Sequence, residues 1–204
     1  MASLESFFPT KVYRARLTRA DALNAALAHA ARVIAEEDKA GRAWCAEHGY
    51  RGYTSYASLN DLAWRDPTFA ALKDELDAHA ALFARELDYD LSGRTLSIDS
   101  MWVNILAPGG AHSGHIHPLS VLSGAYYVDV PDGASALRIE DPRLAMMMAS
   151  PPQRARVRGD NRRFIYLTPA AGALIMWESW LRHEVPVNDT RKDRISVSFN
   201  YALA

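Results

Sequence analysis

The spacing of apolar residues along the chain changes near residue 92. Before that point apolar residues recur every three or four positions, which is typical of amphipathic helices. The spacing predicts a helix over Ala22–Glu47, capped by Thr18 or Asp21, and a second helix that opens at Asp66-Pro67. The apolar face of the second helix is expected to contain Phe69, Leu72, Leu76, Ala80, Leu82 and Phe83.

Between these helices, residues 49–58 form a segment rich in glycine and tyrosine that predicts a loop. Two interpretations of its tyrosines stay open. The rings pack beneath the loop, or they form one wall of a functional site. The spacing of the residues alone does not choose between them.

After residue 92 the pattern becomes that of short strands separated by turns with proline and glycine. Many short strands of this kind favour a sandwich, a jelly roll or a cupin-like barrel, with the N-terminal helices packed on the outside. We expect a single domain over 1–204, with a mainly helical support region over 1–91 and the β core over 92–204. The predicted strands are Thr95–Leu106, Leu122–Val130, Ala136–Ile139, Phe164–Leu167, Ala173–Glu178 and Arg194–Ala202.

One connection, Asp141–Arg163, is much longer than the others and contains a run of methionines followed by a basic stretch. Connections of this length are often lids or binding loops. The alternative is a solvated excursion whose methionines pack back onto the core.

Composition and charge limit the kinds of partner. The chain has 204 residues, a net charge of −1 and no apolar run as long as a membrane span, so we expect neither a nucleic-acid nor a membrane partner. The N-terminus lacks the pattern of a signal peptide. The only cysteine, Cys45, excludes an internal disulfide and sites with several cysteines, and it favours a cytoplasmic location. Homo-oligomerisation stays open.

Histidines are concentrated in residues 112–118, which read His-Ser-Gly-His-Ile-His-Pro. In an extended segment His115 and His117 point to the same face, and a neighbouring strand that carries His183 supplies a third imidazole. Imidazoles so placed suit iron, zinc or copper. Burying them together without a metal would be hard to satisfy. The sequence therefore predicts a metal site held by these three side chains.

The last predicted strand places Arg194 and Ser196 on one face. A guanidinium can bind a carboxylate through two hydrogen bonds, and a serine hydroxyl two residues further along can bind the same group. Burying this charge without a partner would be costly. Either a carboxylate of the protein or one of a ligand is therefore expected beside Arg194.

Taken together, the motifs resemble those of the 2-oxoglutarate/Fe(II)-dependent oxygenases of the double-stranded β-helix (jelly-roll) type, in particular a group of bacterial and phage oxygenases of unknown substrate. The resemblance covers roughly residues 95–204. The matching residues are Trp102 and Asn104, His115 to Pro118, Ser123 to Tyr127, Asp141 to Arg143, His183 to Val185, and Arg194 to Asn200.

The resemblance implies an α+β, mainly β, double-stranded β-helix with helices on the outside, and an oxidoreductase that uses Fe(II) and the cosubstrate 2-oxoglutarate on a small-molecule or peptide substrate. By this resemblance His115 and His183 hold the metal, and Arg194 with Ser196 anchors 2-oxoglutarate. Asn104 and one of two adjacent tyrosines, taken here as Tyr126 rather than Tyr127, would line the pocket.

The departure from the family pattern is His117, which stands where an aspartate or glutamate is usual. Replacing that carboxylate removes one negative charge and should weaken iron retention relative to zinc or copper. A carboxylate from elsewhere could join the site, and the candidates are Glu140, Asp141, Glu178 and Glu184.

Two other functions stay open. Three histidines in this spacing also suit a zinc lyase or hydrolase. The His-x-His motif preceded by glycine suits a non-enzymatic, cupin-like sensor of metals or ligands. Neither alternative explains Arg194 and Ser196.

Overall fold

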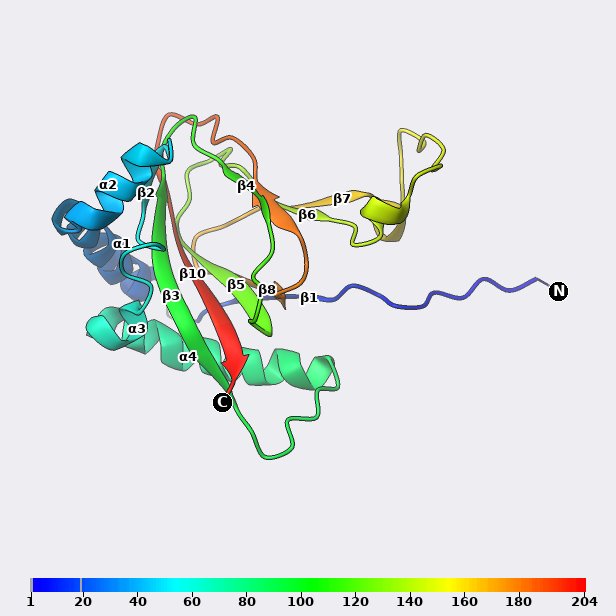
Figure 1. Ribbon diagram of the computed structural model, residues 1–204, viewed down its shortest axis with the longest axis horizontal. Coiled ribbons are helices and arrows are strands. Elements are labelled where there is room, and N and C mark those ends of the chain that lie inside the picture. Colours follow the sequence, from blue (N-terminus) through cyan, green and yellow to red (C-terminus); the bar gives the residue numbers. More distant parts are fainter. Residues whose placement is uncertain (1, 19) are drawn as a thin grey trace.

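The computed structural model describes residues 2–18 and 20–204. The chain folds into two antiparallel sheets, with the helices packed against the outer face of the larger one (Figure 1). The larger sheet has six strands in the order β1-β8-β5-β10-β3-β2, and the smaller has four in the order β4-β9-β6-β7. None of the helices in the described residues has the length and apolar character that a membrane-spanning segment requires.

The larger sheet combines strands from both halves of the chain. Its C-terminal strand β10 lies between β3 and β5, so the last strand along the chain is central in the sheet. Its strands are β1 (Val12–Arg16), β2 (Gly52–Thr54), β3 (Leu96–Leu106), β5 (Leu122–Asp129), β8 (Ala173–Glu178) and β10 (Arg194–Leu203). The smaller sheet contains β4 (His112–His115), β6 (Leu137–Glu140), β7 (Phe164–Leu167) and β9 (His183–Val185).

The helical region differs from its prediction in two places. The predicted helix over Ala22–Glu47 is two helices, α1 (Ala20–Glu37) and α2 (Lys39–Glu47), because Asp38 leaves the helical conformation and caps α2 by accepting a hydrogen bond of 2.9 Å from Gly41 N. The predicted loop over 49–58 contains β2. Gly52, at a φ of +115°, lies so close to β3 that a Cβ atom there would be 2.0 Å from Ile105 O.

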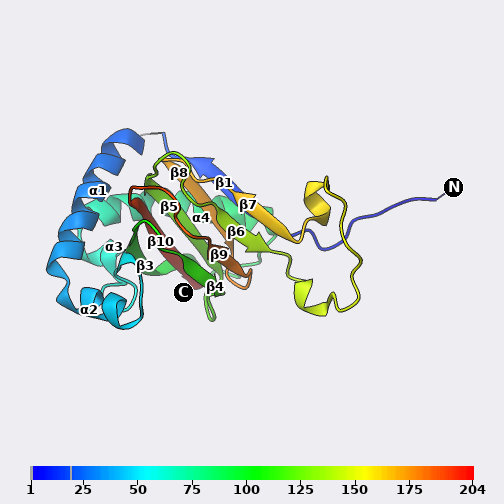
Figure 2. The same cartoon turned by 90° about the horizontal axis from the view of Figure 1, so that it is seen from above.

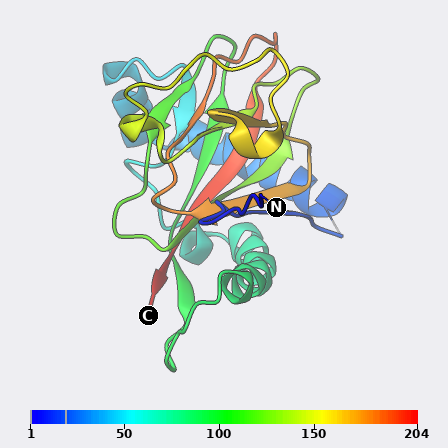
Figure 3. The same ribbon diagram turned by 90° about the vertical axis from the view of Figure 1, so that its right-hand side faces the viewer.

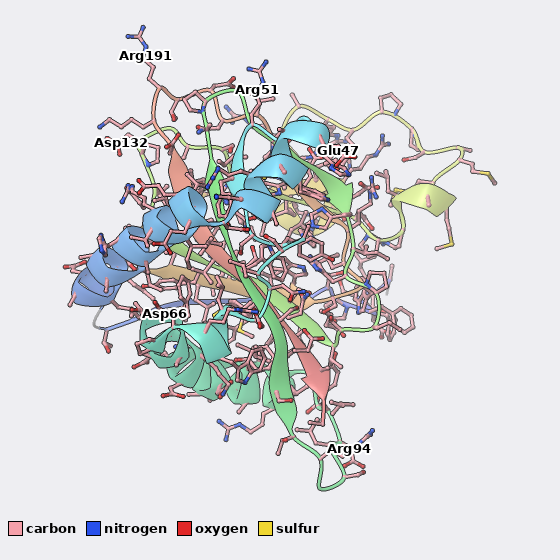
Figure 4. All side chains as sticks on the ribbon, turned by 60° about the vertical axis from the view of Figure 1, so that its left-hand side comes forward. Glu47, Arg51, Asp66, Arg94, Asp132 and Arg191 are labelled. Atoms are coloured by element: carbon pink, nitrogen blue, oxygen red, sulfur yellow. The ribbon has the colours of Figure 1, made fainter. Side chains whose placement is uncertain are left out.

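The second predicted helix is confirmed. A short helix α3 (Leu62–Arg65) precedes α4 (Pro67–Glu86). Asp66 caps α4, because its carboxylate accepts a hydrogen bond of 2.7 Å from Thr68 N (Figure 4). The expected apolar face is buried except for Leu82, which is 40% exposed. This face packs on the sheet and extends the hydrophobic core.

A second hydrophobic cluster joins side chains of the two sheets. The view from above shows how the strands of the two sheets lie relative to one another (Figure 2). It includes Tyr127 and Trp177 from the large sheet and Ile139 from the small one. Each face of the large sheet therefore has its own core, one against the helices and one against the small sheet. The candidate residues Arg194, Ser196 and Asn104 of the large sheet lie on the face toward the small sheet.

Candidate metal centre and anion pocket

The small sheet brings the predicted metal ligands together. Strands β4 and β9 pair so that His115 lies opposite His183. His117 lies just beyond the end of β4 rather than within it, and its backbone N donates a hydrogen bond of 3.0 Å to Ser179 O. One ring nitrogen from each of the three imidazoles lies within 4.8 Å of the others. The Nε2 atoms of His117 and His183 are 3.3 Å apart.

Backbone carbonyls orient two of these rings. His115 Nδ1 lies 2.7 Å from Ser113 O, and His183 Nδ1 lies 2.8 Å from Leu181 O. A carbonyl only accepts hydrogen bonds, so each Nδ1 carries the proton and each Nε2 presents a lone pair. Such a bond to the second ring nitrogen is the usual way in which a protein fixes a metal-binding histidine.

Burial keeps the imidazoles of His117 and His183 neutral. Burial first, and then the proximity of His115, lower the pKa of His117 to about 4 and that of His183 to about 3. Neutral imidazoles at neutral pH are competent ligands, whereas protonated ones repel a cation. The donor set therefore fits a divalent transition metal.

None of the carboxylates considered as a further ligand joins the three histidines. No other histidine, cysteine or acidic residue of the described chain completes this cluster. Each candidate has another partner. Glu178 accepts a hydrogen bond from Tyr89, and the remaining pairs are Glu184 with Arg138, Glu140 with Arg182, and Asp141 with Arg143.

Arg194 lies on the inner face of β10 and is only 3% exposed. Its guanidinium carbon lies 5.0 Å from the centroid of the Tyr127 ring, and its Nη1 donates a long hydrogen bond of 3.5 Å to Ser135 O. No carboxylate within residues 2–18 and 20–204 lies within the 4.0 Å of an ion pair. A buried cation without a protein anion is costly, which favours the second prediction for this residue, a ligand carboxylate.

The Nε atom of Arg194 is one of several buried donor atoms that have no hydrogen-bond partner among the described residues. Such atoms are uncommon in native proteins, and each calls for an explanation. Within the described residues they are Tyr127 OH, Ser135 Oγ, Trp177 Nε1 and Arg194 Nε. Trp177 packs edge-on against His183, with 4.6 Å between ring centroids, so these donors extend from Arg194 to the histidines. All of them can donate to an acceptor, and together they suit an anion rich in oxygen atoms.

The remaining predicted site residues have different outcomes. Ser196 and Asn104 face each other on the inner face of β10 and β3 and are buried. Asn104 accepts a hydrogen bond of 2.8 Å from Thr54 and donates one of 3.0 Å to Ser198, so it belongs to a polar network of the sheet.

The prediction for Tyr126 is wrong. Its hydroxyl donates a hydrogen bond of 2.6 Å to Asn24 of α1, and its ring belongs to the core against the helices. Adjacent residues of a strand point to opposite faces, so Tyr127 faces the small sheet instead and contacts Arg194.

The site also contains residues that the sequence did not single out as ligands. The hydroxyl of Tyr50 lies 2.8 Å from His112 Nε2. Burial, then the nearby positive charge of Arg194 and the proximity of His115, lower the pKa of His112 to about 3. Tyr56 packs edge-on against Trp102, whose ring centroid lies 5.9 Å from that of His117. The segment rich in tyrosine thus contributes a wall, and its composition was the signal that pointed to it.

Similarities to known proteins agree with this geometry. Residues 100–200 match the model of a protein family described as "Putative 2OG-Fe(II) oxygenase". No curated protein sequence is significantly similar to the chain.

Solved structures share the fold. A Pseudomonas putida prolyl-4-hydroxylase is 14% identical, with a TM-score of 0.60 over 95% of this chain and 92% of that one. EctD from S. alaskensis, solved with 2-oxoglutarate and 5-hydroxyectoine, is 16% identical, with a TM-score of 0.65 over 95% of this chain and 72% of that one. AviO1 from Streptomyces viridochromogenes Tue57 is also 16% identical, with a TM-score of 0.62 over 95% and 90%. At these identities the likeness concerns the fold, and it confirms the double-stranded β-helix with helices on the outside.

Proposed function

We propose that the histidine cluster holds Fe(II) and that Arg194 binds the far carboxylate of 2-oxoglutarate. The premise is that this chain belongs, through residues 100–200, to the 2OG-Fe(II) oxygenase family. The observation that carries the second assignment is the burial of the guanidinium without a protein carboxylate. The first rests on the convergence of His115, His117 and His183.

When bound, the iron supplies the activation of oxygen that accompanies oxidation of 2-oxoglutarate to succinate. The side chains of this chain position the reactants. Arg194 and the unpartnered hydroxyl of Tyr127 bind and orient the cosubstrate. The apolar residues of the cluster between the sheets exclude water from that end of the pocket.

Trp177 and Ser135 add donors to the same pocket, since the indole N–H and the serine hydroxyl are buried and have no hydrogen-bond partner within residues 2–18 and 20–204. Ser196, buried on the strand face that also carries Arg194, is part of this assignment. A site with several fixed donors needs little reorganisation when an anion enters.

The substrate is proposed to be a small molecule or a peptide, and neither a nucleic acid nor a membrane is part of the proposal. A cytoplasmic location is also proposed, because the single cysteine, Cys45, is buried and free.

The experiment combines turnover with binding. With Fe(II), ascorbate and oxygen, the protein is expected to form succinate from 2-oxoglutarate slowly in the absence of substrate. Arg194→Leu should weaken 2-oxoglutarate binding at least about tenfold, because a charge-assisted bidentate contact is lost, while metal content stays unchanged. His117→Ala should lower metal content instead.

Each outcome separates the alternatives. If Arg194→Leu leaves the affinity measured by calorimetry unchanged, the residue has a structural role. If His117→Ala retains a full metal complement, that histidine is not a ligand. Hydration of carbon dioxide or cleavage of esters by zinc-loaded protein, without succinate formation by iron-loaded protein, would establish the zinc lyase or hydrolase function. Ligand binding without turnover in either assay would favour the sensor.

A further inference from the structure

The long connection between β6 and β7 forms an arm, residues 141–163, that projects from the body of the molecule (Figures 1 and 2) and lies nearest the viewer in Figure 3. Apart from two short 3-10 turns, Leu144–Met146 and Gly159–Asn161, it has no regular structure within the described residues. It contains six arginines and two aspartates, a net charge of +4. Because the whole chain has a net charge of −1, the remaining residues together are acidic.

The base of the arm lies beside the metal centre. Ile139, just before the arm, pairs with His183 in the sheet, and Glu140 N donates a hydrogen bond of 3.0 Å to Arg182 O. The chain returns at Arg163, whose carbonyl accepts a hydrogen bond of 2.8 Å from Asp141 N. A molecule held at the base of the arm therefore lies near the strand that carries His183.

Four of the six arginines of the arm fall into two groups. Arg143 pairs with Asp141 at 2.8 Å, and Arg163 donates to Ser150 and Pro151, so both shape the base. Arg154 and Arg156 are exposed and form no ion pair or side-chain hydrogen bond with the described residues. A hollow of about 590 Å³ brings both groups together; its arginines are Arg143, Arg154, Arg156, Arg158 and Arg163.

The arm also exposes apolar side chains. Met146 is 76% exposed and Met148 is 95% exposed, and Met147 and Val157 line the same hollow. Flexible methionine side chains adapt to varied apolar partners. A surface of arginine and methionine together matches a segment in which acidic and apolar side chains are mixed.

The arm leads directly into an edge strand. Strand β7 begins at Phe164, one residue after the arm, and is the last strand of the small sheet. Its outer edge pairs with no other strand of the described chain, and Tyr166 on it is 56% exposed. Unpaired backbone groups of an edge strand can accept an extended peptide as an additional strand.

We propose that the arm and the β7 edge together bind an extended acidic peptide segment of a substrate protein and present it to the metal centre. The proposal rests on the proposed oxygenase function for its consequence, and on charge complementarity for the docking itself. A long polyanion fits less well, since the acidic remainder of the molecule would repel whatever extends beyond the arm.

The test measures binding without turnover. The probe is a short fluorescein-labelled peptide of alternating glutamate and leucine, followed by fluorescence anisotropy with the full-length protein. Binding is expected, with an affinity that falls as salt increases. The variant Arg154→Glu with Arg156→Glu should weaken it at least about tenfold, because two charge-assisted contacts become repulsive.

A matched control reverses two cations elsewhere. Arg191→Glu with Lys192→Glu makes the same change in net charge on the exposed turn before β10, away from the arm (Figure 4). This variant is expected to bind the probe like the wild type. Because all four side chains are exposed, circular dichroism should show both variants folded.

Several results would overturn the proposal. These are equal loss of binding in both variants, equal binding of a lysine–leucine peptide, and tighter binding of an oligothymidylate that depends on Arg154 and Arg156. Slow succinate formation, measured in parallel, keeps the two proposals apart. Probe binding without succinate formation would support the docking surface and contradict the oxygenase function. Succinate formation without probe binding would support the oxygenase function and contradict the docking surface.

Discussion

On β10, the two faces of the six-stranded sheet are built from alternate residues whose chemistry is opposite. On β10 the side chains toward the helices are Ile195, Val197, Phe199 and Tyr201, and those toward the small sheet are Arg194, Ser196, Ser198 and Asn200. All are buried or nearly so. Burial of apolar groups stabilises the fold, whereas burial of polar groups is at best neutral unless they are paired.

The polar face divides further along its length. Toward the C-terminal end of β10 its groups pair with one another, as where Ser123 donates to Asn200 at 2.8 Å and Asn200 donates to Ser100 at 3.0 Å. Toward Arg194, the Tyr127 hydroxyl and Arg194 Nε have no hydrogen-bond partner in the part of the chain that the structure describes. The comparison teaches that one face maintains the fold, while one end of the other face is kept ready for a ligand.

The largest expected effect separates the two faces by stability. Phe199→Ala should lower the free energy of unfolding by about 3–5 kcal/mol, since Phe199 is fully buried against the helix-side core. Ser198→Ala, one residue away on the polar face, loses the hydrogen bond from Asn104 and should cost about 1 kcal/mol. Urea denaturation of both variants measures the difference, and similar losses would show that the faces contribute alike.

A second expectation concerns pH and the polar side of the molecule. The pKa values of His112, His117 and His183 are lowered to about 3, 4 and 3 by burial, against about 6.5 in the unfolded chain. Between these values the unfolded chain binds more protons than the folded one, so stability is present above about pH 6.5 and is lost as the pH falls.

For metal-free protein the free energy of unfolding should decrease between pH 7 and pH 5, by about 1 kcal/mol per pH unit for each imidazole that charges only on unfolding. Urea titrations at several pH values, after removal of metal by a chelator, measure this slope. His112→Gln should reduce the slope, and a stability that does not change over this range would contradict the burial of neutral imidazoles.

The smallest expected change in stability comes from a comparison of two adjacent tyrosines that face opposite sides of the sheet. Tyr126→Phe removes the donor to Asn24 and should cost about 1 kcal/mol of stability, with no change in 2-oxoglutarate affinity. Tyr127→Phe removes a hydroxyl without a protein partner, so stability should hold while affinity falls. Thermal denaturation and calorimetry of both variants test the pair, and exchanged phenotypes would place the pocket on the other face.

Much of this arrangement could be predicted from the sequence. The long strands and both main helical regions follow from apolar periodicity. The grouping of the three histidines follows from the alternation of side chains in extended segments. The short strands β1 and β2 were not predicted, and β4 and β9 were expected only as extended segments that carry the histidines. Three to five residues carry little periodicity, and their pairing depends on distant partners.

The error at Tyr126 has a local cause. Strand β5 is buried on both faces up to Val128, so its sequence does not show which residues face which core. The pairing of β5 with β10 also shifts between Ile195 and Ser196. The orientation of the two tyrosines therefore depends on tertiary contacts that periodicity cannot supply.

The central place of β10 has a consequence for the order of folding. Its partners β3 and β5 precede it by many residues, so neither can complete its pairing until residues up to Leu203 have left the ribosome. Pairings between such distant segments form slowly. Arg194 arrives with this strand, so the anion pocket cannot form in a nascent chain before the sheet closes, and an incompletely synthesised chain exposes strand edges without gaining a binding site.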